Sequence, residues 1–151
     1  MLLIYNGPID ELSNQILFQY YFSAYATSGI IQTGNFVTFQ EFHVNNGNTF
    51  DLSTGTFTAP VSGIYEFTFS GNTDSSVNCR IKVYKNDNED FHSFYDSGGL
   101  NNISQYANLG STWIVLLDAG DTIKLKVDGG KLYSDSAANR ILTGKLLEKT
   151  S

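Results

Sequence analysis

The most informative stretch of the sequence runs from residue 39 to residue 69 and reads FQEFHVNNGNTFDLSTGTFTAPVSGIYEFTF. Near its end, the aromatic residues Tyr65, Phe67 and Phe69 alternate with polar residues, which is the pattern of a β-strand with one buried face. The pairs Asn46-Gly47 and Thr54-Gly55 interrupt the earlier part, because Asn and Gly tolerate the backbone angles of tight turns. The stretch therefore predicts short strands joined by tight turns.

The same alternation continues on both sides of this stretch. Runs with a period of two occupy residues 18–26, 77–83 and 123–127. Residues 113–117 are apolar at every position, which predicts a strand buried on both faces. No segment after residue 17 has the 3.6-residue period of an amphipathic helix. Many short strands at a spacing of roughly 8–12 residues predict an all-β antiparallel sandwich or barrel, and the jelly roll is one member of that set.

The composition limits the kind of protein. The chain has 151 residues, which suits one domain, and its single cysteine, Cys79, excludes an internal disulfide and a zinc site of several thiolates. Nine basic and fifteen acidic residues give a net charge of -6, which argues against a nucleic-acid-binding protein. No run approaches the roughly 18 apolar residues of a membrane span. Residues 1–17 are interpreted as an N-terminal arm, and they lack the basic region of a secretory signal peptide.

The spacing of the aromatic residues is more specific than their period. In chain order, the fixed positions are Phe39, Asn45, Phe50, Phe57, Gly63, Tyr65, Phe67 and Phe69. This spacing resembles the signature of the complement C1q-like globular domain, a member of the tumour necrosis factor-like jelly-roll superfamily. Downstream, LLDAGDTI at residues 116–123 resembles the turn of that family at Gly120 and Asp121. Residues 142–147 resemble its closing strand, with Leu142 where an aromatic residue is usual.

Elementary chemistry explains why such positions would be fixed. Each of the six aromatic side chains can bury about 150–250 Å² of surface. Asn45 precedes a turn whose backbone an asparagine side chain can bond, and Gly63 stands where the chain must bend without a Cβ. These are scaffold roles, so the signature identifies a fold and leaves the ligand open.

The resemblance implies a ten-stranded antiparallel jelly-roll sandwich over residues 18–151 that packs as a homotrimer. Tyr20, Tyr21, Tyr25 and Tyr84 exceed what one core needs, and they are candidates for contacts between subunits because interface cores favour aromatic residues. An ordinary surface position is the alternative for each of these tyrosines. The resemblance also implies an extracellular setting and a non-enzymatic recognition role towards a protein, glycan or cell-surface ligand.

Two other functions compete with recognition. One alternative is a structural trimeric head or cap of a filament, spore coat or virion, and another is a hydrolase on a jelly roll. The residues do not favour catalysis, because His43 lies in a strand-like stretch, His92 in a polar loop, and Cys79 on an apolar strand face. No nucleophile elbow or phosphate loop is present in the sequence. The polar stretch 86–108 and residues 71–76 are the expected ligand-contacting loops.

Calcium is the one cofactor that the resemblance implies, because some relatives bind it near the trimer axis through loop aspartates. Residues 94–96 resemble one such position, so Asp96 is the expected ligand. The second acidic position falls near residues 104–106, which contain no carboxylate, although Asn101 and Asn102 could supply oxygens. Calcium takes about six to eight oxygen ligands. A solvated loop aspartate is the alternative interpretation of Asp96.

Overall fold

The computed structural model describes residues 19–73, 78–95 and 107–150. The predicted arm at residues 1–17 and the predicted calcium ligand Asp96 lie outside the described residues. Every regular element within these ranges is a β-strand, so the all-β prediction is confirmed. The described part of the chain has no helix long and apolar enough to cross a membrane.

Twelve strands lie in the described part of the chain. They are β1 (Tyr21–Ala26), β2 (Gly29–Gln32), β3 (Glu41–Asn46), β4 (Phe50–Asp51), β5 (Thr56–Thr58), β6 (Gly63–Thr73), β7 (Arg80–Lys85), β8 (Asn88–Tyr95), β9 (Asn108–Leu117), β10 (Thr122–Gly129), β11 (Lys131–Ser134) and β12 (Arg140–Lys149). The resemblance implied ten strands. The number is higher here because short ladders count as separate strands: β4 has two residues, and β2 and β11 form a four-residue ladder of their own.

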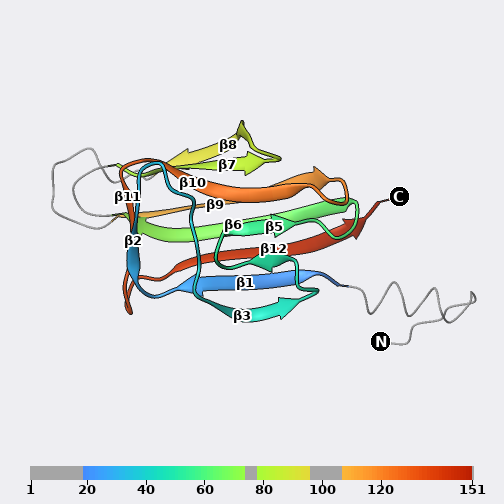
Figure 1. Ribbon diagram of the computed structural model, residues 1–151, viewed down its shortest axis with the longest axis horizontal. Helices are drawn as coiled ribbons and strands as arrows, with labels where there is room; N and C mark the ends of the chain where they lie inside the picture. Colours follow the sequence, from blue (N-terminus) through green and yellow to red (C-terminus); the bar gives the residue numbers. More distant parts are fainter. Residues whose placement is uncertain (1–18, 74–77, 96–106, 151) are drawn as a thin grey trace, which may run out of the picture.

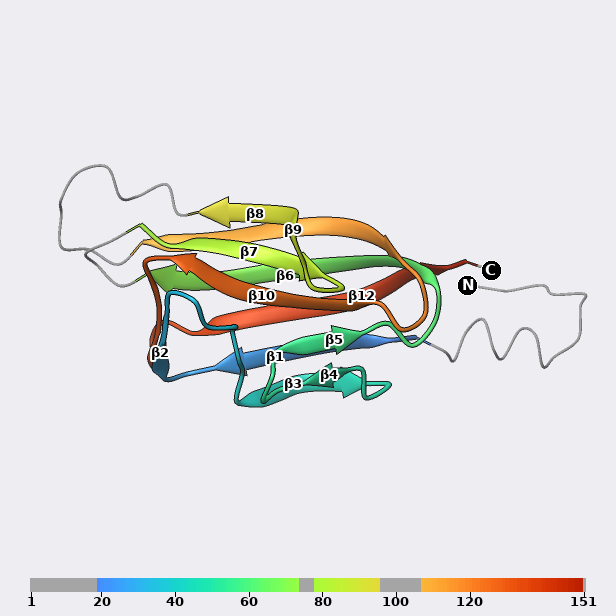
Figure 2. The same cartoon turned by 45° about the horizontal axis from the view of Figure 1, so that its top comes forward.

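The strands form two antiparallel sheets packed face to face (Figures 1 and 2). In the larger sheet, β9 pairs with β6, and β6 is followed by β12, β1 and β3, while β11 and β2 continue beside the end of β6. The smaller sheet has the order β4-β5-β10-β7-β8. The first and last strands, β1 and β12, therefore lie side by side, as in a jelly roll.

The inner faces of the two sheets enclose one aromatic core. The ring of Phe57 on β5 lies 5.8 Å from that of Phe22, 5.3 Å from that of Tyr65 and 5.1 Å from that of Phe67. Phe22 also stacks on Phe50 of β4 at 4.4 Å. Such aromatic pairs contribute about 0.5–1.5 kcal/mol each beyond the burial of their surface. The alternation of residues 65–69 in the sequence is thus the inward row of β6.

Strand β9 differs from its predicted environment. The run at residues 113–117 predicted a strand buried on both faces, but Ile114 and Leu116 are 60% and 59% exposed. Trp113, Val115 and Leu117 do point into the core. The pattern was misleading because β9 is an edge strand whose outer face has no other described element of this chain over it. An apolar outer face on a strand like this is typical of a surface that another molecule covers.

Strand β8 replaces part of a predicted loop. Residues 86–108 were expected to be a polar loop containing His92, whereas residues 88–95 form β8 and His92 lies within it. The turn before β8 consists of Asn86 and Asp87, both with positive φ, at 51° and 66°. Two consecutive residues of this kind form the two-residue turn that matches the twist of a hairpin.

Candidate functional site

The six aromatic residues of the signature lie in the core. They stabilise the fold and are not exposed to a ligand. Phe39, Phe50, Phe57, Tyr65, Phe67 and Phe69 are all at most 5% exposed. The one polar group among them is the Tyr65 hydroxyl, which donates a hydrogen bond of 2.6 Å to the carbonyl oxygen of Val61. This bond fixes the bend that leads from Pro60 into β6.

The two non-aromatic signature residues have roles that differ from the expected ones. Asn45 lies within β3, paired with Phe22, and the side chain that reaches out here belongs to its neighbour Asn46, which bonds the carbonyl oxygen of Gln19. A Cβ on Gly63 would stand 2.6 Å from the carbonyl oxygen of Glu148. Gly63 is therefore needed because β12 approaches it closely, not because of a positive φ.

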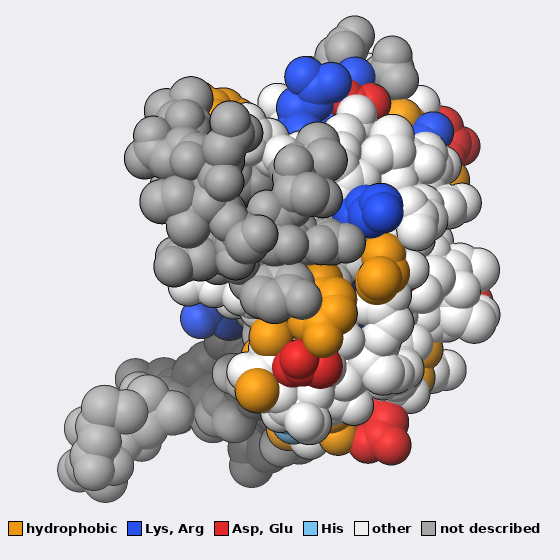
Figure 3. Space-filling model, turned by 90° about the vertical axis from the view of Figure 1, so that its left-hand side faces the viewer, with side chains coloured by type: hydrophobic (Ala, Val, Ile, Leu, Met, Phe, Trp, Pro, Cys, Tyr) orange, Lys and Arg blue, Asp and Glu red, His pale blue; other side chains and the backbone are white. Residues whose placement is uncertain are grey.

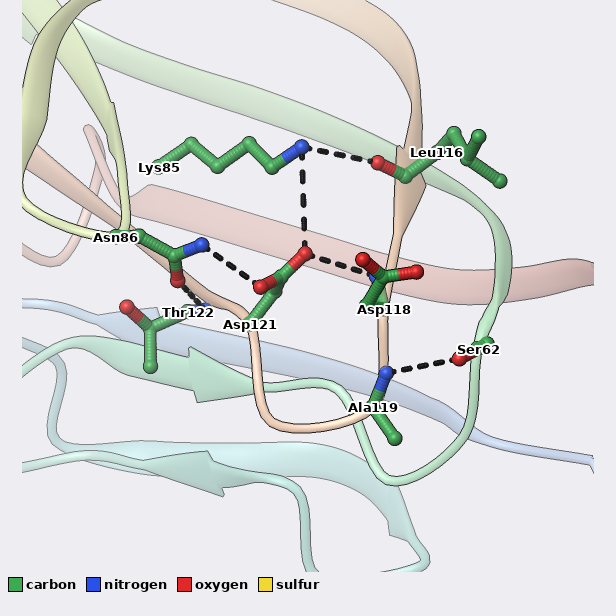
Figure 4. Close-up of polar contacts among 8 residues, drawn as sticks. All are labelled: Ser62, Lys85, Asn86, Leu116, Asp118, Ala119, Asp121 and Thr122. Atoms are coloured by element: carbon green, nitrogen blue, oxygen red, sulfur yellow. Dashed lines mark hydrogen bonds and ion pairs between the residues drawn. The ribbon is translucent and has the colours of Figure 1, made fainter.

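Asp121 lies at the centre of a polar network that joins two turns, and Gly120 precedes it in one of them (Figure 4). Gly120 takes a φ of +94°, which glycine adopts without strain. One carboxylate oxygen of Asp121 accepts a bond of 2.7 Å from the Asn86 side chain, and the other accepts a bond of 2.8 Å from the Asp118 amide. The Lys85 Nζ atom lies 4.0 Å from the Asp121 Oδ2 atom and donates a hydrogen bond to the carbonyl oxygen of Leu116. The turn between β9 and β10 is thus fastened to the turn between β7 and β8.

These bonds change the acidity of Asp121. The hydrogen bond from Asn86, followed by the bond from the Asp118 amide, lowers the pKa of the Asp121 carboxyl from its ordinary value, and the charge of Lys85 adds the smallest contribution. Burial acts in the opposite direction but is a weaker effect than the two hydrogen bonds. The network therefore holds Asp121 ionised and engaged, which is the state of a structural carboxylate and not of a general acid.

The outer face of the larger sheet carries several exposed apolar side chains. We call it the open face, and it consists of the outward side chains of β9, β6, β12, β1 and β3. It exposes Ile114 and Leu116 on β9, Tyr21 on β1 and Val44 on β3. Between them, Glu66 and Lys145 form an ion pair of 3.6 Å, and the hydroxyls of Thr68 and Thr112 lie 2.9 Å apart. The surface is thus apolar at its two edges and polar but internally bonded in its middle.

A groove lies on the other side of the sandwich, along β4 and the turns around it. Its volume is about 1140 Å³, and it is lined by the segment 47–54 together with Phe36, Phe42, Pro60 and Lys124. Thr49 is 7% exposed, and its Oγ1 atom has no hydrogen-bond partner within the described part of the chain. Asp51 also lines the groove, but its carboxylate already accepts hydrogen bonds from Ser53 and Thr54 in a local turn. These bonds lower the pKa of the Asp51 carboxyl.

The sequence of this chain matches a known family model. Residues 21–147 match the model described as "C1q domain", which is most of the chain and includes β1 to β11 whole and β12 up to its residue 147. The chain belongs to the C1q domain family.

Similar proteins agree with this assignment. This C1q domain is 34% identical over 118 residues to "Complement C1q tumor necrosis factor-related protein 3" of mouse and of human, covering 76% of this chain. That match covers 45% of those relatives, so the chain spans about half the length of the curated relatives it matches.

Solved structures show the same fold. The globular domain of zebrafish complement 1qA protein superposes with a TM-score of 0.63 at 21% identity, covering 87% of this chain and 99% of that chain. The Eiger TNF of S. frugiperda superposes with a TM-score of 0.64 at 12% identity, covering 87% and 96%. Both confirm the predicted C1q- and TNF-like jelly roll.

The tyrosines predicted at subunit contacts of the C1q domain have different surroundings. Tyr21 is 40% exposed on the open face, and Tyr25 is half-buried there. The Tyr25 hydroxyl donates to Glu41 at 2.6 Å, and its ring stacks on His43 at 4.0 Å. Tyr84 is only 8% exposed because it packs against Phe36 inside its own chain, so it is not a spare contact residue.

The candidate catalytic groups of the C1q domain are engaged in packing or hydrogen bonds. His43 stacks on Tyr25 and lies 3.3 Å from the Ser23 hydroxyl. His92 lies 3.1 Å from the Ser111 hydroxyl and beside the ring of Trp113 at 5.5 Å. Cys79 is fully buried. The sequence suggested solvent around His92, whereas the structure places it against β9.

The predicted calcium site rests on residues outside the described ranges. Asp96 and its neighbours Asn101 and Asn102 all belong to this part of the chain. Among the described residues, no three His, Cys, Asp or Glu side chains come together in a way that could hold a metal ion. The calcium site at Asp96 therefore stays a prediction.

Proposed function

We propose that this C1q domain is a non-enzymatic recognition module that assembles as a homotrimer through its open face. It would act outside the cell and present loop surfaces of three copies to a protein, glycan or cell-surface ligand. Three weak contacts made together bind far more tightly than one, because the later contacts form at high effective concentration. The family assignment and the distribution of exposed apolar residues support this proposal.

The observation that carries the assembly is the pair Ile114 and Leu116. Both are about 60% exposed on β9, in a strand whose sequence is apolar on both faces. Leu116 lies opposite Ile64 of β6, so the apolar patch continues inward from the sheet edge at this pair, whereas Ile114 lies opposite Glu66 and marks where the patch ends. Burial of each such side chain contributes about 1.5–3 kcal/mol. A neighbouring copy of the chain is a suitable cover, because in a closed ring of three the patch of each copy meets a different surface of the next copy.

Sedimentation equilibrium at micromolar concentration tests the assembly. The unaltered chain is expected to give three times its mass of 16.7 kDa. The double variant Ile114→Glu/Leu116→Glu should sediment as a single chain, because the charges must be desolvated at the contact. Ile30→Glu/Tyr95→Glu is the matched control, since it places the same charges on two exposed apolar residues outside the open face, and it should remain trimeric. A single-chain mass for the unaltered protein would contradict the proposal.

The competing function is a structural trimeric head or cap of a larger assembly with no ligand of its own. Both functions use the open face, so the oligomeric state does not separate them. A glycan and protein array does, because binding by the isolated trimer supports recognition, whereas dependence on the parent chain supports the structural role.

A further inference from the structure

The basic side chains of this acidic protein are concentrated on the outer face of the smaller sheet. Five of the nine Lys and Arg residues lie on the neighbouring strands β7 and β10. Four of them (Arg80, Lys82, Lys124 and Lys126) alternate with buried residues and so point outward. Figure 3 shows several Lys and Arg side chains standing together at the top of the view, the side on which β7 and β8 lie in Figure 1.

Two of these cations occupy an unfavourable position for the fold alone. Lys82 on β7 and Lys126 on β10 are direct cross-strand partners. Side chains in such pairs have Cβ atoms about 4.5–5.5 Å apart, and like charges there destabilise a sheet. Asp128 lies 3.7 Å from Lys82 but also binds Arg80, and none of the ion pairs in the described part of the chain includes Lys126. The sheet therefore keeps a repulsive pair that an anion bound between the two ammonium groups would neutralise.

Two aromatic rings, those of Phe36 and Tyr84, lie close to the ammonium groups of Lys124 and Lys126. The Lys124 Nζ atom lies 4.4 Å from the centre of the Phe36 ring, and the Lys126 Nζ atom lies 5.4 Å from it and 5.7 Å from the Tyr84 ring. The two ammonium groups therefore lie close to the same ring, that of Phe36. Lys124 also has an ion pair of 2.7 Å with Asp87, whose side chain is 79% exposed and is screened by solvent.

The cation cluster adjoins the groove described above. Phe36 and Lys124 belong to both, so the basic surface continues into a concave wall rich in hydroxyl groups. The hydroxyl of Thr49 on this wall has no bond within the described residues. A groove with hydroxyls, an aromatic ring and cations at one end suits an extended anionic sugar chain, whereas a membrane surface is flat and could not enter it.

We propose that the cluster of Lys82, Lys124 and Lys126 binds the sulfate or carboxylate groups of an anionic polysaccharide, with neighbouring sugars lying across Phe36 into the groove. This inference deepens the proposed function, because it names a ligand class and a site for recognition. The site lies on the smaller sheet and does not use the open face, so its occupation is independent of whether three copies assemble.

Binding of two defined probes tests the site: a sulfated heparin oligosaccharide and a hyaluronan oligosaccharide, which carries only carboxylates. The double variant Lys82→Gln/Lys126→Gln should weaken the binding of whichever probe the unaltered chain binds by about tenfold, or about 1.4 kcal/mol. The variant Lys131→Gln/Lys149→Gln removes the same charge from sites outside the cluster and the groove, and it should bind within about twofold of the unaltered chain. Binding should weaken as salt is added.

Several outcomes would overturn the proposal. The first is that the unaltered chain binds neither oligosaccharide. The second is that both double variants lose the same amount of binding. The third is that the chain binds phosphatidylserine vesicles but neither sugar. Thermal unfolding of Lys82→Gln/Lys126→Gln checks the fold, and the unfolding temperature should not fall because a repulsion has been removed. If that variant nevertheless failed to fold, Phe36→Ala would take its place, with the same expected loss. Sedimentation of the same samples separates this test from the trimer proposal, since a monomer that binds heparin through Lys82 and Lys126 supports the site alone.

Discussion

The side chains of Asn86 and Asp121 hold two turns of the sandwich together. The Asn86 amide nitrogen donates to the Asp121 carboxylate at 2.7 Å, and the Asn86 amide oxygen accepts a bond of 2.8 Å from the backbone of Thr122 (Figure 4). Asn86 can do this because it takes a positive φ of 51° at the first position of its turn. The β7–β8 hairpin is therefore positioned by Asp121 in the β9–β10 turn and by the first residue of β10, Thr122.

Replacement of Asp121 by asparagine should loosen this junction. The variant Asp121→Asn loses the charge-assisted bonds from Asn86 and the Asp118 amide, each of which contributes about 1 kcal/mol or more. We expect a decrease of about 1–2 kcal/mol in the free energy of unfolding, measured with urea. Asp118→Asn is the control, because Asp118 takes part in this network through its backbone, and it should change stability by less than about 0.5 kcal/mol.

Acid should destabilise the domain through three aspartates. Hydrogen bonds lower the pKa of Asp51, Asp121 and Asp135 below the ordinary value of 3.8. Because these pKa values are lower in the folded chain, the stabilisation is fully present above the unfolded value and is lost as the pH falls through the folded values. Unfolding midpoints should therefore be level from about pH 7 to pH 5 and should fall below about pH 4. A midpoint that rises towards pH 3 would contradict this assignment.

Arg140 is a buried cation held by neutral oxygens. It is 3% exposed, and it donates to the carbonyl oxygen of Thr38 at 2.8 Å, to that of Ser28 at 3.2 Å and to the hydroxyl of Ser134 at 3.0 Å. Burial lowers the pKa of its guanidinium. Arg140→Met leaves these acceptors unsatisfied and should lower the free energy of unfolding by about 2–4 kcal/mol. Arg140→Lys should recover only part of the loss, because one ammonium group cannot reproduce the planar fork.

The aromatic spacing predicted the fold because its residues meet in one place. Phe57 on one sheet contacts Tyr65 and Phe67 on the other, so their separation in sequence reflects a fixed geometry of strands and turns. Loop surfaces carry no such constraint, and the ligand could not be predicted from them. The cation cluster was missed for a related reason: Lys82 and Lys126 are far apart in the sequence, and only the register of β7 and β10 makes them partners.

The two strand errors have separate physical causes. Ile114 and Leu116 appeared core-like because composition alone does not distinguish a residue buried in the core from an apolar residue exposed on the outer face of an edge strand. Residues 88–95 appeared loop-like because β8 is polar along much of its length, and polar edge strands lack a strong alternation. The adjoining Asn86-Asp87 pair could have predicted this hairpin, because Asn and Asp tolerate the positive φ of a two-residue turn.

Gly144 is required by the core, and a single methyl group tests this. A Cβ at this position would stand 2.5 Å from a ring carbon of Phe22 and 2.8 Å from one of Phe67, and both rings are at most 2% exposed. Gly144→Ala should therefore destabilise the domain by about 1–3 kcal/mol, since buried rings must move out of a close-packed core. Gly129→Ala is the matched control, because its nearest neighbour would be a side-chain carbon of Arg80 at 3.8 Å. Thermal unfolding of the two variants should differ by several degrees, with Gly129→Ala near the unaltered chain. Equal unfolding temperatures for the two variants would show that β1 and β6 can separate to admit the methyl group, and that the aromatic core is less tightly packed than these distances indicate.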